Sequence, residues 1–167
     1  RGNLIRGAVR RGASTTTVVT GNGINYHNGP VLHQINLYYL YYGNWSGLDS
    51  TGPAILEDFA KNVGGSPYFA INTTYGDTTG TVPNAVTFAG KYSDSGSLGT
   101  SLTDSNIATI VSNAINSGQL GTAGVADPNG LYMVLTAPGV QETSGFLTQY
   151  CGWHDWGTFG TTPVQFS

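Results

Sequence analysis

The densest group of reactive side chains is the run Cys151-Gly152-Trp153-His154-Asp155-Trp156 near the C-terminal end. A cysteine and a histidine three residues apart could share a metal ion, or the thiol could act as a nucleophile with the imidazole as its base. Zinc usually needs three or four protein ligands, and no second pair occurs at ligand spacing. The alternative is structural: Cys151 is a buried thiol or a disulfide partner for a residue outside this chain, and His154 is a packed polar group. We favour the structural interpretation, keep Cys151, His154 and Asp155 as catalytic candidates only, and assign no metal site.

Aromatic residues are the second group that could bind a ligand. The chain has ten tyrosines and three tryptophans, and sugar rings pack on aromatic faces. The tyrosine run at residues 38–42 is interpreted as structural, because half of it would be buried in a sheet. Trp45, Trp153 and Trp156 are therefore the candidates for carbohydrate binding.

Two segments match the acceptor pattern for N-linked glycans, Asn44-Trp45-Ser46 and Asn72-Thr73-Thr74. The first follows a predicted strand end, where a glycan could reach solvent. Asn44 and Asn72 are thus the glycosylation candidates of a eukaryotic source.

The remaining polar residues indicate no catalytic set. Glu57 and Asp58 are adjacent on a predicted helix, so they point apart, and both are expected on a solvated face. His33 alternates with core positions and is expected to be packed. The sequence has no Gly-x-Ser-x-Gly, phosphate-binding loop or His-Glu-x-x-His.

Charge is scarce and unevenly placed. Charged residues make up 9% of the 167 residues, against roughly 25% in ordinary soluble domains. Four of the six cations are Arg1, Arg6, Arg10 and Arg11, so beyond residue 11 two lysines face nine carboxylates. This argues against nucleic-acid binding, which needs a basic face. No apolar run approaches the roughly 18 to 20 residues that cross a bilayer, and the richness in Thr, Ser, Asn and Gly is typical of secreted proteins.

Periodicity predicts a layered α/β domain with a mixed sheet and at least two helices. A strand is predicted over residues 31–42, ending at Gly43. Its first residues alternate between apolar and polar side chains, and its later residues are apolar on both sides, so it is expected to enter the centre of the sheet. A helix follows within residues 51–65, with Pro53 in its first turn. Its apolar stripe is Ile55, Leu56, Phe59 and Val63, and Gly64 takes the left-handed position after it. The clearest helix begins at residue 103 and ends at Gly118.

Further strands are expected at residues 68–75, 85–92 and 131–137, and the chain stops within an apparent strand at residues 163–167. Residues 1–25 are rich in Gly, Thr and Arg and are predicted to be a basic arm. This arm is either flexible or ordered against a neighbouring molecule.

Five separated segments resemble one known family. They are YHNGPVLHQINLYYLYYGNWS, ILEDFAKNV, SLTDSNIATIVSNAI, PNGLYMVLTAPGV and YCGWHDWG, and together they run in order from Tyr26 to about Phe166. This combination resembles the phosphate-induced protein 1 or EXORDIUM family. The resemblance implies a protein of the extracellular space or cell wall, linked in plants to growth, without a settled biochemical activity.

The resemblance also concerns length. Residues 26–167 look like the N-terminal half of typical members, whose second half carries more cysteines and a His-Glu-x-x-Glu-like helix similar to that of zinc-dependent hydrolases. A zincin-like fold and a zinc cofactor are therefore expected only together with that second half.

Three functions follow as expectations. The first is a secreted protein of the cell surface or matrix that acts by binding or by self-assembly, through the 1–25 arm or a C-terminal half. Unpaired strand edges recruit other chains, and the strand ending at Ser167 is expected to be such an edge. The second is part of a zincin-like hydrolase whose metal helix lies in a missing or cleaved half. The third is a carbohydrate-binding module.

Overall fold

A six-stranded mixed sheet forms the centre of the molecule, in the order β1-β9-β10-β7-β2-β5. The computed structural model describes residues 2–6, 31–46 and 51–167. The sheet strands are β1 (Leu4–Arg6), β2 (Asn36–Tyr42), β5 (Thr87–Asp94), β7 (Gly130–Thr136), β9 (Asp155–Phe159) and β10 (Thr162–Phe166). Strands β10, β7, β2 and β5 are parallel, whereas β9 runs antiparallel to both β10 and β1.

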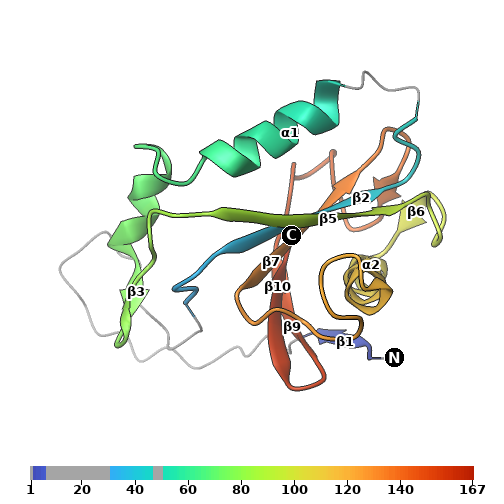
Figure 1. Ribbon diagram of the computed structural model, residues 1–167. Coiled ribbons are helices and arrows are strands. Elements are labelled where there is room, and N and C mark those ends of the chain that lie inside the picture. The colour runs from blue at the N-terminus through green and yellow to red at the C-terminus, as the bar shows by residue number, and fades with distance from the viewer. Residues whose placement is uncertain (1, 7–30, 47–50) are drawn as a thin grey trace.

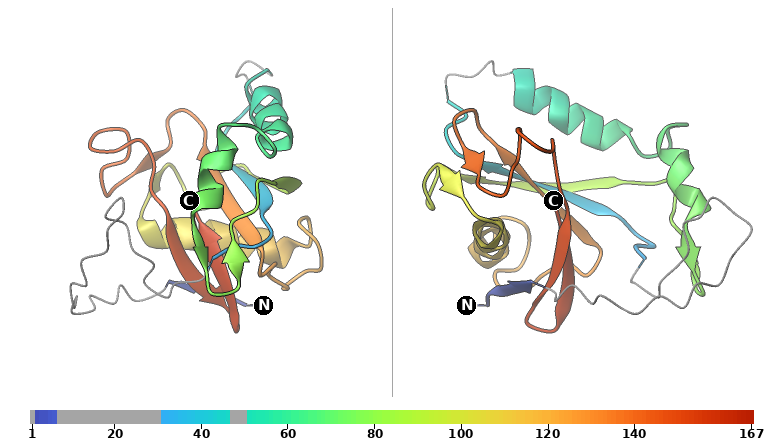
Figure 2. Two further views of the ribbon diagram at one scale, coloured as in Figure 1. Left: turned by 90° about the vertical axis from the view of Figure 1, so that its left-hand side faces the viewer. Right: turned by 180° about the vertical axis from the view of Figure 1, so that it is seen from behind.

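Two helices cover the sheet from opposite sides. Helix α1 (Thr51–Asn62) lies on one face and helix α2 (Asp104–Ser117) on the other (Figure 1), and the two further views agree (Figure 2). A 3-10 helix, η1 (Phe69–Thr74), and two small sheets complete the fold: β3 (Gly76–Asp77) with β4 (Gly80–Thr81), and β6 (Ser101–Leu102) with β8 (Gln141–Glu142). The predicted layered α/β architecture is confirmed. Among the described residues, no helix is long and apolar enough to cross a lipid bilayer.

The tyrosine-rich strand β2 lies between β7 and β5 and is buried on both faces. Tyr38, Leu40 and Tyr42 pack in the core beneath α2, while Leu37, Tyr39 and Tyr41 pack with Ala60 of α1. An apolar run without alternation is what a strand between two helical layers requires. The predicted central position of this strand is therefore confirmed.

The hydroxyl groups of two tyrosines in this strand, Tyr38 and Tyr42, make hydrogen bonds that phenylalanine could not make. Tyr38 Oη donates to Asp127 Oδ2 at 2.9 Å, and Tyr42 Oη donates to the Gly99 carbonyl at 2.8 Å. The Tyr42 oxygen also accepts from the Leu98 amide at 2.8 Å. A buried tyrosine usually needs such a partner at its polar end, so these bonds join the strand to loops at the rim of the core.

Helix α2 supplies most of the core on its side. Thr103 caps it reciprocally with Asn106, and Gly118 ends it in the left-handed conformation at φ 78°. Seven of its residues are buried: Ile107, Ala108, Ile110, Val111, Ser112, Ala114 and Ile115. The predicted helix, its apolar stripe and its final glycine are confirmed.

Helix α1 is also confirmed, but its expected stripe is split. Leu56 packs against the core and Val63 is buried, whereas Ile55 is 65% exposed and Phe59 is 53% exposed. The prediction for Gly64 is wrong, because the left-handed residue is Gly65 at φ 79°. Gly64 is required for a different reason: a Cβ there would lie 2.4 Å from the Val86 amide nitrogen.

The strand expected at residues 68–75 is wrong, since this segment forms η1. Three side chains bond to carbonyl groups three residues earlier: Asn72 to Phe69, Thr73 to Ala70 and Thr74 to Ile71. Such local bonds offer the backbone an alternative to a strand ladder.

Two strand ends differ from expectation. Strand β2 begins at Asn36 rather than at residue 31, and His33 before it is exposed rather than packed. Strand β10 is present as predicted, but it pairs with β9 on one side and β7 on the other. It is therefore not an unpaired edge. The edges of the sheet are β1 and β5. Strand β1 consists of residues 4–6 of the predicted arm, and residues 7–25 of that arm lie outside the described residues.

Candidate functional site

The connections of the sheet place a crevice at the carboxyl ends of its central strands. From β2 the chain passes through α1 to β5 on one side, and from β5 it returns through α2 to β7 on the other side of β2. The order of the strands therefore reverses between β2 and β7, and the two connecting helices lie on opposite faces of the sheet. In open α/β sheets, ligands bind at such switch points.

A hollow of about 630 Å³ runs along β7 from Leu131 to Thr136 and reaches Trp45 beyond the carboxyl end of β2; we call it the aromatic hollow. Its apolar lining includes Trp45, Leu131, Met133, Leu135, Phe146 and Trp153, and its polar lining includes Thr136, Glu142, Cys151, His154 and Ser167. The volume falls within the range of roughly 300 to 1,000 Å³ typical of small-molecule sites. A mainly apolar wall with a few polar groups suits a ligand that has both an apolar face and hydroxyl groups.

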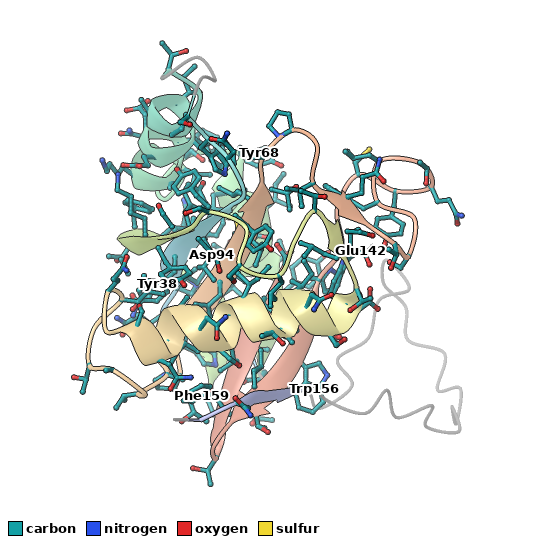
Figure 3. All side chains as sticks on the ribbon, turned by 90° about the vertical axis from the view of Figure 1, so that its right-hand side faces the viewer. Tyr38, Tyr68, Asp94, Glu142, Trp156 and Phe159 are labelled. Carbon is teal, nitrogen blue, oxygen red and sulfur yellow. The ribbon has the colours of Figure 1, made fainter. Side chains whose placement is uncertain are left out.

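Glu142 holds the segment that forms one wall of the aromatic hollow. The residue is only 6% exposed and lies near the first turn of α2 (Figure 3). Its carboxylate accepts from the Ser144 amide at 3.0 Å and from the Tyr150 hydroxyl at 2.8 Å, and Ser144 Oγ donates to it as well. Burial alone would raise the pKa of Glu142, but these hydrogen bonds outweigh burial and lower it. The charged carboxylate therefore fixes the turn that leads to Phe146 and Cys151.

The catalytic candidates are partly brought together. Cys151 and His154 both line the aromatic hollow and both are exposed, and Cys151 is a free thiol. The alternative of a buried thiol is therefore wrong, while a disulfide to a residue outside the chain stays a prediction. His154 is exposed rather than packed as expected. Asp155 begins β9 and does not line the hollow.

Trp45 follows the sharp turn at Gly43, where φ is 95° and a Cβ would lie 2.8 Å from Val140 Cγ2. The indole nitrogen donates to the Tyr42 carbonyl at 3.2 Å, and the ring meets Tyr41 edge-on at 5.1 Å between centroids. These contacts hold the indole in one orientation beside the aromatic hollow.

A second hollow of about 590 Å³ lies at the carboxyl ends of β2 and β5, next to α1. We call it the polar hollow; its lining includes Asn44, Trp45, Ser46, Glu57, Lys91, Ser93 and Ser95. Lys91 Nζ lies 2.7 Å from Glu57 Oε1. Glu57 was expected on a solvated face, but its side chain is 16% exposed and ion-paired, whereas Asp58 is exposed. Burial and the Glu57 charge raise the pKa of the neighbouring Tyr41 to about 12.

The other candidate residues lie outside the aromatic hollow. Trp156 is 46% exposed on β9 and lines neither hollow, and Figure 3 shows it apart from Glu142. Asn44 is exposed and its Oδ1 accepts from Ser46. Asn72 is half-buried within η1, and its Nδ2, the atom that a glycan would modify, donates to the Phe69 carbonyl at 3.1 Å. Asn44 is thus the more accessible glycosylation candidate.

The described ranges contain no group of three His, Cys, Asp or Glu side chains placed to hold a metal ion. The expected zinc was assigned to residues outside this chain, so the hydrolase alternative stays a prediction. Sequence reasoning missed Glu142, Phe146 and the Glu57–Lys91 pair. Of these, only the Glu57–Lys91 pair could be suspected from the sequence, because the predicted helix carries an acidic residue and the predicted strand a basic one. The sequence does not show that these two residues lie opposite each other.

Comparison with known proteins identifies the family. The family model of the phosphate-induced protein 1 conserved region matches residues 24–165, which is most of the chain. No match was found among curated proteins or among solved structures. The match spans the central strand β2, both helices and every residue named in the two hollows except Ser167, and the chain therefore belongs to the phosphate-induced protein 1 family.

Proposed function

We propose that this chain is an extracellular protein of the cell surface or cell wall that acts by binding carbohydrate in the aromatic hollow. The observation that carries the proposal is the convergence of Trp45 and Trp153, which are far apart in the sequence, on one hollow beside β7. Sugar rings have apolar faces that pack on aromatic side chains and hydroxyl groups that need polar partners. Thr136 and His154 supply such partners beside the tryptophans.

The extracellular location rests on composition and on family membership. The chain is poor in charge and rich in small polar residues, and the family is linked to the cell wall. We expect the protein, expressed from its complete gene with a C-terminal epitope tag, to be recovered in the medium or the wall fraction. Recovery in the cytosolic fraction alone would contradict the proposed location.

The experiment for binding is a glycan array carrying β-glucan, xylan, mannan and galactan oligosaccharides, from single sugars up to hexasaccharides. We expect Trp153→Ala and Trp45→Ala to weaken binding by about tenfold or more, equivalent to about 1.4 kcal/mol, because each removes an aromatic wall. Trp156→Ala is the matched control and should bind as the unmodified protein does, since Trp156 lies outside both hollows.

Folding must be checked in parallel, because both hollow tryptophans also contact the core. Trp45 meets Tyr41, and Trp153 meets Phe166 with ring centroids 6.0 Å apart. The melting temperature of each variant is therefore measured, and Trp153→Phe is included as a milder change. If no oligosaccharide binds, or if Trp156→Ala weakens binding as much as Trp153→Ala, the proposal is wrong.

A further inference from the structure

Trp45 belongs to both hollows, and this shared wall suggests how they are used. The residue lines the aromatic hollow over β7 and also the polar hollow at the ends of β2 and β5. Its indole is fixed by the bond to the Tyr42 carbonyl and by the contact with Tyr41. Trp45 is therefore a wall that the two hollows share.

The chemistry of the polar hollow suits uncharged hydroxyl groups. Its main charges, Glu57 and Lys91, are already paired at 2.7 Å. The carboxylate of Asp94 accepts from the Gly96 and Ser97 amides and from Ser97 Oγ, so it is occupied within its own turn. A free ion would therefore find its opposite charge already neutralised, whereas a hydroxyl group can donate to Glu57 and accept from Lys91 without breaking their pairing.

We infer that the two hollows form one binding groove for an extended oligosaccharide, with one part of the chain in the aromatic hollow, another in the polar hollow and Trp45 between them. This inference rests on the proposed carbohydrate binding and adds that the ligand is a chain rather than a single sugar. The polar hollow supplies the second subsite, through Asn44, Glu57, Lys91 and Ser93.

The test compares affinity with ligand length, using the oligosaccharides of the same four glycans in solution calorimetry. Protein made without N-glycans is used, because a glycan on Asn44 would lie at the polar hollow. We expect affinity to rise by about tenfold, or about 1.4 kcal/mol, as the oligosaccharide grows from a length that fills one hollow to a length that reaches both.

Variants on β5 separate the two subsites. Ser93→Phe fills the polar hollow and should abolish the gain with length, while leaving the binding of short oligosaccharides unchanged. Thr87→Phe is the matched control, because Thr87 is exposed on the same strand but lines neither hollow. Should Ser93→Phe fail to fold, Ser95→Phe introduces the same block just beyond the strand.

The outcomes distinguish the inference from the function on which it rests. The groove is overturned if affinity does not depend on ligand length, or if both blocking variants keep the gain in affinity with length. Carbohydrate binding itself still stands in that case, provided that Trp153→Ala still weakens binding. Absence of any oligosaccharide binding overturns both. A gain lost in a blocking variant and kept in Thr87→Phe supports the groove.

Discussion

At the scale of single residues, His33 is the side chain whose environment differs most from expectation. Its Nδ1 lies 3.2 Å from the Thr81 carbonyl oxygen and its Nε2 lies 3.0 Å from Asp77 Oδ1. Since both neighbours are hydrogen-bond acceptors, the ring satisfies both only as a cation with two N–H groups. The bond to Asp77 raises the pKa of His33 above its usual 6.5, and hydrogen bonds from Thr79 and His33 lower the pKa of Asp77.

These shifts predict a pH window for the contact between His33 and the β3–β4 hairpin. The contribution of His33 is complete below its usual pKa of 6.5 and is lost as the pH rises through its raised pKa. The contribution of Asp77 is complete above its usual pKa of 3.8 and is lost as the pH falls through its lowered pKa. We expect the exchange of the Thr79 and Gly80 amides with solvent, corrected for intrinsic rates, to be slowest between these limits.

The measurement is an NMR titration of the His33 ring in the unmodified protein and in Asp77→Asn. The variant should bring the pKa of His33 back toward 6.5, because the carboxylate charge is removed. Asp58→Asn is the control and should leave the titration unchanged, since Asp58 lies on α1. A His33 that titrates at or below its usual value in the unmodified protein would disprove this arrangement.

At the scale of elements, the end of α1 carries two adjacent glycines with different roles. A Cβ on Gly64 would lie 2.4 Å from the Val86 amide nitrogen, whereas Gly65 has open space and a φ of 79°. We expect Gly64→Ala to lower the free energy of unfolding by about 3 kcal/mol, because backbone must move. Gly65→Ala should cost only about 1 to 2 kcal/mol, the usual strain of a left-handed residue.

Urea denaturation monitored by circular dichroism measures both changes. Gly52→Ala is the matched control inside α1: a Cβ there meets nothing within 4 Å, and we expect a gain of about 0.5 kcal/mol from helix propensity. Equal costs at Gly64 and Gly65 would contradict the close approach of the helix end to the segment before β5.

The same elements show where local patterns are sufficient. Helix α2 was predicted with its stripe and its end because it buries a complete apolar face. Segment 69–74 was predicted wrongly because its Asn and Thr side chains bond to their own backbone. Apolar and aromatic residues favour a strand there, and only the observed bonds show that the segment turns instead.

At the scale of the whole molecule, the two helical layers differ in burial. Helix α2 buries seven residues, whereas only Ala60 is fully buried in α1. We expect native-state hydrogen exchange to show the slowest amides in α2 and β2. Amides of α1 should exchange at least about tenfold faster, equivalent to about 1.4 kcal/mol of protection. If α1 and α2 are equally protected, the two layers unfold as one unit and this account of their stability is wrong.

The sequence by itself determined the family, the layered α/β class, the central position of the tyrosine-rich strand and the two long helices. These features follow from periodicity and from turn residues, because a long element that packs against the core has apolar residues at regular intervals along its own sequence. It also provided Trp45 and Trp153 as candidates, but it grouped Trp156 with them and could not separate their roles.

Only the tertiary structure decided which distant residues meet. The crossing of the chain from β5 over β2 to β7 brings Trp45 to the segment that carries Trp153, and no local pattern encodes that meeting. The same holds for the Glu57–Lys91 pair, for the turn held by Glu142 and for the contact of His33 with Asp77. The physical reason is that periodicity reports how deeply a residue is buried, whereas a binding site depends on which strands are neighbours and in what register.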